Sequence, residues 1–213
     1  MENKLWLDLR LSEATMNYLW KRINYPTLSS NDARKKLAGN ISRSNWIQDK
    51  DDWFYENVLK ELAEKMFLID PVVESHLIVK EKIPEFKLKT LWVNYQKQYE
   101  FNPPHNHKAL FSFVVFMKIP THWKEQHALP ISVSSHIPLA STFSFILGKE
   151  QGRVQNIPVH LCPEDEGRML FFPAWLMHEV FPFYGTEEER ITVSGNIILD
   201  SENFYNKTFY HKE

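Results

Sequence analysis

Hydrophobic residues near the start of the chain recur with the period of an α-helix. Met16, Leu19 and Ile23 lie on one face of such a helix, and Ser12 supplies an N-cap before it. The helix is expected to end before Pro26, which cannot continue it. A second helix is predicted in WFYENVLKELAEKMFLID, residues 53–70, where hydrophobic residues recur at four-residue steps with charged residues between them.

The pattern changes after residue 85. The stretch 29–52 is predicted to be a loop with a turn at Gly39, but from residue 85 onward short β-type runs are separated by proline and glycine. The absence of a helical period between these runs favours a β-sandwich or barrel over βαβ units. We therefore expect a single domain of the α+β class, mainly β, with a helix-rich N-terminal part (1–85), a β core (86–200) and a C-terminal tail (201–213). The seven runs are residues 88–96, 111–120, 141–148, 152–161, 167–175, 178–185 and 190–199.

Two histidines, His105 and His107, stand just before the second β run. Residues two apart on a strand point to the same face, so a strand that ends here would place both imidazoles together. His178, between Trp175 and Phe181, is the natural third ligand from a distant strand. Neutral imidazole binds iron, zinc, copper or nickel. Spacing alone leaves two interpretations open, a metal site or ordinary surface and core histidines.

The last predicted strand carries an arginine on its polar face. Arg190, Thr192, Ser194 and Asn196 share this face. A guanidinium that points inward is costly to bury without a carboxylate partner, and its planar fork is suited to bind one. The alternative is that Arg190 points to solvent or pairs with one of the three glutamates at 187–189.

The first β run also has a polar face. Asn94 and Gln96 lie on the same face as Trp92 when this run forms a strand. They are either inward polar contacts or part of an outward polar surface, and the spacing does not decide between the two.

Four segments, in this order and spacing, resemble the non-haem Fe(II)/2-oxoglutarate-dependent oxygenase superfamily: NYQKQYEFNPPHNH, FSFVVFMKIP, GRMLFFPAWLMHEVFPF and RITVSGNI. The chain is most similar to small oxygenases found in bacteria and their phages. The resemblance covers roughly residues 91–199, and residues 167–196 are its more specific part. It implies a double-stranded β-helix core (a cupin-like jelly roll) flanked by helices.

The resemblance also implies which residues bind the metal. His105 and His178 match the first and the distal iron ligands. At position 107 the superfamily usually has a carboxylate, whereas this chain has His107, and the H-x-H form occurs in the similar small oxygenases. Two schemes stay open: all three histidines bind the metal, or two bind it and water takes the remaining place.

The cofactors implied by the resemblance are Fe(II) and 2-oxoglutarate. Arg190 matches the basic residue that binds the distal carboxylate of 2-oxoglutarate. The reaction so implied uses dioxygen to couple decarboxylation of 2-oxoglutarate to succinate with oxidation, most simply hydroxylation, of an unidentified substrate. The candidate cofactor-binding residues are Arg190, Thr192, Ser194, Asn94 and Gln96.

Composition narrows the remaining classes of protein. A formal net charge of −2 and a pI near 6.5 provide no long-range attraction to phosphate, so a nucleic-acid partner is not expected. The single cysteine, Cys162, excludes an intramolecular disulfide and a multi-cysteine zinc site. The N-terminus lacks the apolar region of a secretory signal, and no run reaches the ~18 apolar residues of a membrane span. We therefore expect a cytoplasmic protein.

Two functions from other classes compete with the oxygenase. One is a cupin-like metal-binding module without oxygenase activity, which His107 in place of a carboxylate favours. The other is a structural β-sandwich whose histidines are incidental. A charge-transfer band from a metal–2-oxoglutarate complex would support the oxygenase, bound metal without this band would support the module, and no stoichiometric metal would support the structural β-sandwich.

Overall fold

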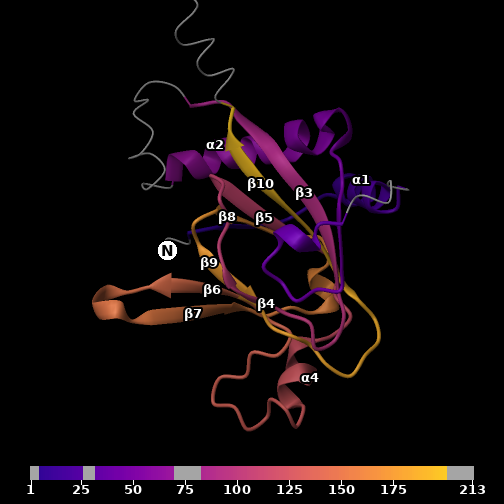
Figure 1. Ribbon diagram of the computed structural model, residues 1–213, viewed down its shortest axis with the longest axis vertical. Helices are drawn as coiled ribbons and strands as arrows, with labels where there is room; N and C mark the ends of the chain where they lie inside the picture. Colours follow the sequence, from indigo (N-terminus) through magenta and orange to yellow (C-terminus); the bar gives the residue numbers. More distant parts are fainter. Residues whose placement is uncertain (1–4, 26–31, 70–82, 201–213) are drawn as a thin grey trace, which may run out of the picture.

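The computed structural model describes residues 5–25, 32–69 and 83–200, and within these ranges two antiparallel sheets form the body of the molecule (Figure 1). The predicted tail, 201–213, lies outside the described residues. The six-stranded sheet has the order β1-β8-β5-β10-β3-β2, and the four-stranded sheet has the order β4-β9-β6-β7. The strands of the large sheet are β1 (Leu7–Arg10), β8 (Arg168–Pro173), β5 (Phe111–Lys118), β10 (Arg190–Leu199), β3 (Phe86–Gln96) and β2 (Arg43–Trp46). Those of the small sheet are β4 (Asn102–His105), β9 (Met177–Val180), β6 (Phe143–Gly148) and β7 (Val154–Val159).

Both predicted helices are present. In α1 (Glu13–Ile23) the hydroxyl of Ser12 accepts a hydrogen bond from the backbone N–H of Thr15 at 3.2 Å, which is the expected N-cap. The second predicted helix is α2 (Lys60–Ile69), which continues from a π-helical turn, Tyr55–Leu59. A short helix, α4 (Trp123–Ala128), was not predicted.

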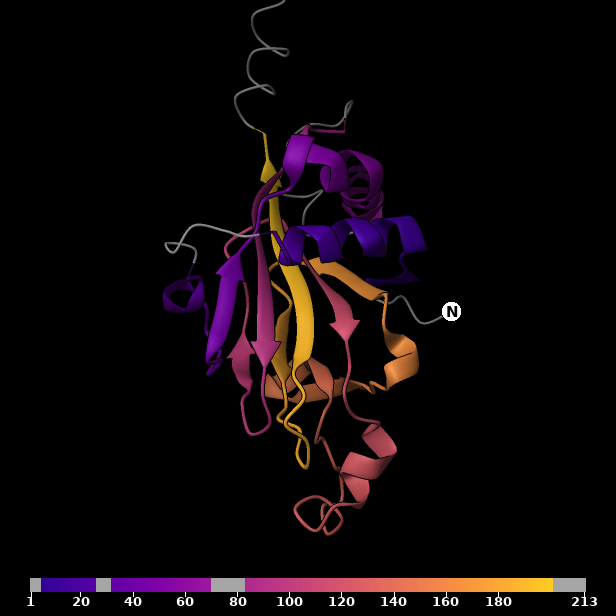
Figure 2. The same cartoon turned by 90° about the vertical axis from the view of Figure 1, so that its right-hand side faces the viewer.

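Helices α1 and α2 cover the outer face of the large sheet (Figure 2). Leu19 of α1 and Met66 of α2 are almost completely buried in one cluster with Val93, Phe171 and Val193 of the sheet. A second cluster, which includes Phe116 and Phe172 of the large sheet and Phe143 and Phe145 of the small one, lies between the sheets. Strand β5 therefore has apolar neighbours on both faces, which explains its unbroken hydrophobic sequence.

Strands β3 and β10 are paired so that their polar positions face one another. Arg190 is opposite Gln96, Thr192 is opposite Asn94, and Ser194 is opposite Trp92. Residues directly opposite in an antiparallel pair point to the same side of the sheet. The register thus gathers these side chains into one strip on the side that faces the small sheet.

The N-terminal part is less purely helical than the sequence pattern predicts. Strand β2 lies within the stretch predicted to be a loop, 29–52, where it pairs with β3, and β1 pairs with β8 at the other edge. Each is a four-residue edge strand, too short to show a clear alternation of polar and apolar residues. Among the helices of the described residues, none is long and apolar enough to cross a membrane.

Candidate metal centre

Three histidines meet between the two sheets. His105 ends β4 and is directly opposite His178 of β9, while His107 follows two residues after β4 and its backbone N–H donates to the carbonyl of Ala174 at 2.9 Å. The ring centroids are 4.3 Å apart for His105 and His178, 5.1 Å for His107 and His178, and 5.2 Å for His105 and His107. One nitrogen from each ring lies within 4.8 Å of the other two, so the cluster can hold a metal ion.

Hydrogen bonds to the backbone orient two of these rings. Nδ1 of His105 donates to the carbonyl of Pro103 at 2.7 Å, and Nδ1 of His178 donates to the carbonyl of Leu176 at 2.9 Å. Because a carbonyl only accepts, each Nδ1 carries the proton and each Nε2 keeps its lone pair. Metal-binding histidines show the same arrangement, in which the second nitrogen is fixed by a carbonyl or a carboxylate.

Burial keeps the three imidazoles neutral. It lowers the pKa of His105, lowers the pKa of His107 to about 4 with a further contribution from nearby His105, and lowers the pKa of His178 well below its usual value. The low-dielectric surroundings are aromatic: the ring of Phe143 stacks on His178 with centroids 5.4 Å apart, and Trp92 lies 5.8 Å from His107. At neutral pH all three lone pairs are therefore available to a metal.

Arg190 points inward and is 1% exposed. Its Nη1 donates to Oε1 of Gln96 at 3.3 Å, and its Nη2 donates to the carbonyl and the hydroxyl of Ser141 at 3.0 and 2.5 Å. Its Nε has no hydrogen-bond partner in the described part of the chain. Burial lowers the pKa of Arg190 to about 10, so the group remains charged at neutral pH.

The acidic residues before Arg190 are engaged elsewhere. Glu189 pairs with Arg43 at 2.5 Å, Glu188 pairs with Lys118 at 2.7 Å, and Glu187 accepts from Gln98 at 2.6 Å. The alternative in which Arg190 is exposed or bound to these glutamates is therefore wrong. Within the described ranges no carboxylate forms an ion pair with this buried cation, which makes its surroundings suited to an anionic ligand.

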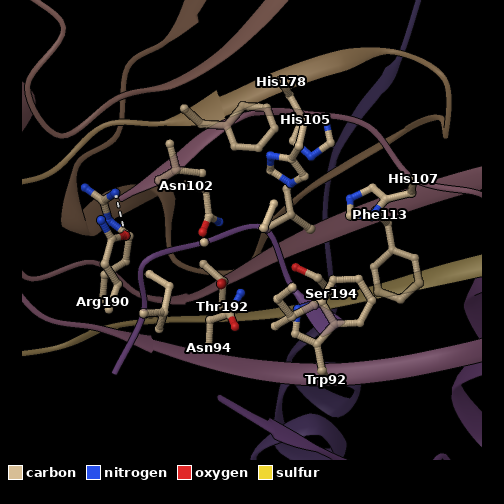
Figure 3. A pocket seen from close by; sticks show the side chains of 18 of the residues that line it. Trp92, Asn94, Asn102, His105, His107, Phe113, His178, Arg190, Thr192 and Ser194 are labelled. Atoms are coloured by element: carbon tan, nitrogen blue, oxygen red, sulfur yellow. Dashed lines mark hydrogen bonds between the residues drawn. The ribbon is translucent and has the colours of Figure 1, made fainter. Parts of the chain in front are cut away.

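A cavity of about 170 Å³ connects the arginine with the histidines. In Figure 3, Arg190 and the three histidines stand at opposite ends of this space, with Thr192 between them. Trp92, Asn94, Gln96, Thr192 and Ser194 all line the cavity, so the polar face of β3 is inward. Gln96 contacts Arg190, and Asn94 accepts a hydrogen bond from the hydroxyl of Ser44 at 2.7 Å.

The site also depends on residues that the sequence did not indicate. Ser141 is fully buried with φ of 65°, a left-handed conformation that is unfavourable for serine, and its N–H is fixed by the carbonyl of Pro182 at 2.8 Å. This conformation presents both its carbonyl and its hydroxyl to Arg190. On another side, residues 36–39 and Asn102 line the cavity, and a Cβ at Gly39 would lie 1.7 Å from Oδ1 of Asn102. Glycine at position 39 thus allows the predicted turn to pack directly against Asn102.

Comparison with protein-family models matches residues 90–196 to the family described as "Putative 2OG-Fe(II) oxygenase". The matched range contains the three histidines, Arg190 and the strip formed by β3 and β10. Comparison with curated protein sequences gave no match.

Several solved structures share the fold. The non-haem alpha-ketoglutarate-dependent carbocyclase SnoK from nogalamycin biosynthesis is 7% identical, with a TM-score of 0.54 over 93% of this chain and 80% of that chain. A prolyl hydroxylase from Trichoplax adhaerens, solved with a hypoxia inducible factor peptide, is 10% identical, with a TM-score of 0.51 over 96% of this chain and 87% of that chain. The alpha-ketoglutarate-dependent epimerase SnoN, also from nogalamycin biosynthesis, is 14% identical, with a TM-score of 0.51 over 92% and 78%. At such identities the likeness concerns the fold, and it confirms the predicted double-stranded β-helix.

Proposed function

The chain belongs to the 2OG-Fe(II) oxygenase family, and from that premise we propose that it is a hydroxylase whose iron is bound by His105, His107 and His178. Its cofactors are Fe(II) and 2-oxoglutarate, and its reaction consumes dioxygen. The observation that carries the residue assignment is the shared cavity, which has three neutral imidazoles at one end and a buried arginine without a carboxylate at the other.

The histidines fit an iron ion by their chemistry and by their orientation. Imidazole nitrogen is a common ligand of Fe(II), and the carbonyls of Pro103 and Leu176 direct Nε2 of two rings away from the backbone. His107 takes the place of the usual carboxylate, and its nitrogen lies within the same 4.8 Å cluster. We therefore favour the scheme in which all three histidines bind the metal.

Arg190 fits the distal carboxylate of 2-oxoglutarate. A charged guanidinium that is buried forms strong, directional hydrogen bonds to a carboxylate. Gln96 and Ser141 fix two of its nitrogens, so they orient the fork. Thr192, Ser194 and Asn94 line the space between this arginine and the metal centre, and we assign them to contacts along the co-substrate.

The protein contributes position and exclusion of water. When bound, Fe(II) and 2-oxoglutarate supply, with dioxygen, the oxidising chemistry that yields succinate and a hydroxylated substrate. Phe116, Phe143 and Phe172 line the cavity and keep bulk water from the centre. The segment 36–39 and Asn102 form the wall that is free of proposed metal or co-substrate contacts, so we place substrate entry there.

The proposal is tested by adding Fe(II) and 2-oxoglutarate without oxygen. A metal-to-ligand charge-transfer band should appear in the parent protein. Arg190→Ala should weaken 2-oxoglutarate binding by about 100-fold, since two charge-assisted hydrogen bonds are worth about 1.5–3 kcal/mol each and are partly replaced by water. Arg153→Ala, which removes an exposed arginine from the β6–β7 hairpin, serves as the matched control.

Each hypothesis predicts a different outcome. Stoichiometric metal without the band would support the metal-binding module, and no stoichiometric metal would support the structural β-sandwich. Succinate release with a panel of substrates, followed by incorporation of labelled dioxygen into the product, separates a hydroxylase from other oxidations.

The domain organisation predicted from the sequence belongs to the same proposal. We propose one oxygenase domain in which the helix-rich N-terminal part supports the large sheet, consistent with the burial of Leu19 and Met66 against it. A cytoplasmic location and a bacterial or phage source stay predictions.

A further inference from the structure

A second group of ligand-type side chains lies beside α4. One ligand atom each from His122, Cys162 and Glu164 falls within 4.8 Å of the other two. His122 is the N-cap of α4, and Cys162 begins the short turn Pro163–Asp165 that precedes β8. The backbone N–H of Trp123 donates to the carbonyl of Leu161 at 3.0 Å and holds the two segments together. Among the described residues, those lining the co-substrate cavity include none of the three.

Asp165 lies beside this group of three residues and contacts Cys162. Its Oδ2 lies 3.2 Å from Sγ of Cys162 and accepts the backbone N–H of Cys162 at 3.1 Å. In a tetrahedral zinc site with Zn–S of about 2.3 Å and Zn–O of about 2.0 Å, sulfur and oxygen ligands are about 3.5 Å apart. The present separation requires only a small adjustment to reach this value.

The charges of the group match a divalent cation. Burial, and then the carboxylates of Glu164 and Asp165, raise the pKa of the Cys162 thiol to about 11. Among the nearby arginines, Nη1 of Arg168 forms an ion pair with the other oxygen of Asp165 at 3.4 Å and offsets part of its charge, whereas Arg10 donates to backbone carbonyls, including that of Glu164 at 2.5 Å. A bound cation reverses the effect on the thiol, because metal binding displaces the proton and the carboxylates then stabilise the complex.

Metal binding by His122 requires that one local hydrogen bond be replaced. Its Nδ1 accepts the backbone N–H of Lys124 at 3.1 Å, so Nε2 carries the proton in this arrangement. Binding of a metal at either nitrogen breaks this cap or moves the proton. The N–H of Lys124 is at the surface, where water replaces the lost acceptor, so the exchange does not prevent binding.

We propose that His122, Cys162, Glu164 and Asp165 form a zinc site that joins the start of α4 to the turn before β8. Zinc is the ion of choice because one thiolate, one imidazole and two carboxylates supply four ligands of the types that it binds in a tetrahedron. This site is separate from the proposed iron centre, which consists of three imidazoles and has no sulfur ligand.

The single cysteine makes the test specific. Because Cys162 is the one cysteine of the chain, a thiolate-to-metal signal can come only from Cys162. Chelator-treated full-length protein is titrated with Co²⁺, and a near-ultraviolet thiolate-to-cobalt band is expected in the parent and absent in Cys162→Ser. In the unaltered protein, Zn²⁺ should slow the reaction of Cys162 with a disulfide reagent at least tenfold.

Three variants locate the ligands. His122→Ala should abolish both the cobalt band and the Zn²⁺ protection, while His136→Ala, at an exposed histidine in the loop after α4, should leave both unchanged. His178→Ala should remove one metal equivalent and retain the thiolate band, which separates this site from the iron centre. The proposal is overturned if excess Zn²⁺ leaves the thiol reaction rate unchanged, or if the near-ultraviolet band persists in Cys162→Ser.

Discussion

In the proposed site, His107 is the residue that decides how many protein atoms would hold the iron. Its backbone is fixed to Ala174, and its ring is 5.2 and 5.1 Å from those of His105 and His178. A neutral imidazole in place of a carboxylate removes one negative charge from the ligand set. We therefore expect Fe(II) to bind more weakly than in a site with two histidines and a carboxylate.

Substitution of His107 tests this directly. His107→Ala should weaken Fe(II) binding at least tenfold, because one of three protein ligands is lost from a buried site. His107→Asp should retain binding or strengthen it, since a carboxylate restores both a ligand and a negative charge. Competition with a coloured chelator under anaerobic conditions gives both affinities.

His136→Ala is the control for these variants, because it removes an exposed histidine without touching the cavity. Equal affinities for His107→Ala and the parent would mean that only His105 and His178 bind the metal, with water in the third place. That outcome would select the second of the two schemes that the sequence leaves open.

The sequence was sufficient to select the residues whose side chains have a distinctive chemistry, the histidines and Arg190. The inward side of Arg190 follows from strand periodicity. The sequence also selected His105 and His107, but His107 lies two residues beyond β4 and is placed in the cavity by its backbone hydrogen bond to Ala174 instead of by a shared strand face. Ser141 was missed because its contacts with Arg190 depend on a left-handed backbone conformation, φ of 65°. A serine in a sequence gives no sign of such a conformation. The direction of Asn94 and Gln96 also required the structure, since two faces of a strand are equivalent until packing is known.

At the scale of elements, β10 is the central support of the site. It lies between β3 and β5 in the large sheet and carries Arg190, Thr192 and Ser194. Gly195 lets it fit there: a Cβ at this position would lie 2.5 Å from Cζ of Phe113 and 2.8 Å from the carbonyl oxygen of Thr90. The backbone atom cannot move aside as a flexible side chain can, so the space is available to glycine alone.

Gly195→Ala should therefore destabilise the protein. We expect a loss of about 1–3 kcal/mol in the free energy of unfolding, the usual cost of added atoms in a packed core. Denaturant unfolding followed by fluorescence measures the change.

The matched control is Gly148→Ala in β6. A Cβ at Gly148 meets no atom within 4 Å, so this variant should be as stable as the parent. An equal loss in both variants would contradict the packing argument and point to a general effect of alanine on these strands.

The elements that the sequence predicts well are those with long, regular patterns. Each of the seven β runs overlaps a strand, and each of these strands contributes apolar residues to the two buried clusters. Strands β1, β2 and β4 have four residues each, and β4 contains Pro103 and Pro104, which argue against a strand. The positions of these three short strands are set by tertiary contacts, because their sequences are too short to show a regular pattern of polar and apolar residues. The six residues of α4 are likewise too few to show a helical period.

At the scale of the molecule, the site is divided between the two sheets. His105 and His178 lie on β4 and β9 of the small sheet, whereas Arg190 lies on β10 of the large sheet. In the proposed site the metal would therefore join parts of the small sheet, and 2-oxoglutarate bound between the metal and Arg190 would join the two sheets. Ligand binding stabilises the structure that it requires, so the two ligands should protect different strands.

Hydrogen exchange can separate these two contributions, with Ni²⁺ as a metal that does not start the reaction. Ni²⁺ alone should slow exchange in β4 and β9, and addition of 2-oxoglutarate should extend the protection to residues 190–194 of β10 and to the facing part of β3. Arg190→Ala should abolish the second effect and retain the first, because it removes the contact on the large sheet and leaves the histidines intact. If Ni²⁺ alone protected β10 as strongly as both ligands together, the sheets would already be coupled through their packing, and the co-substrate would not be the link between them.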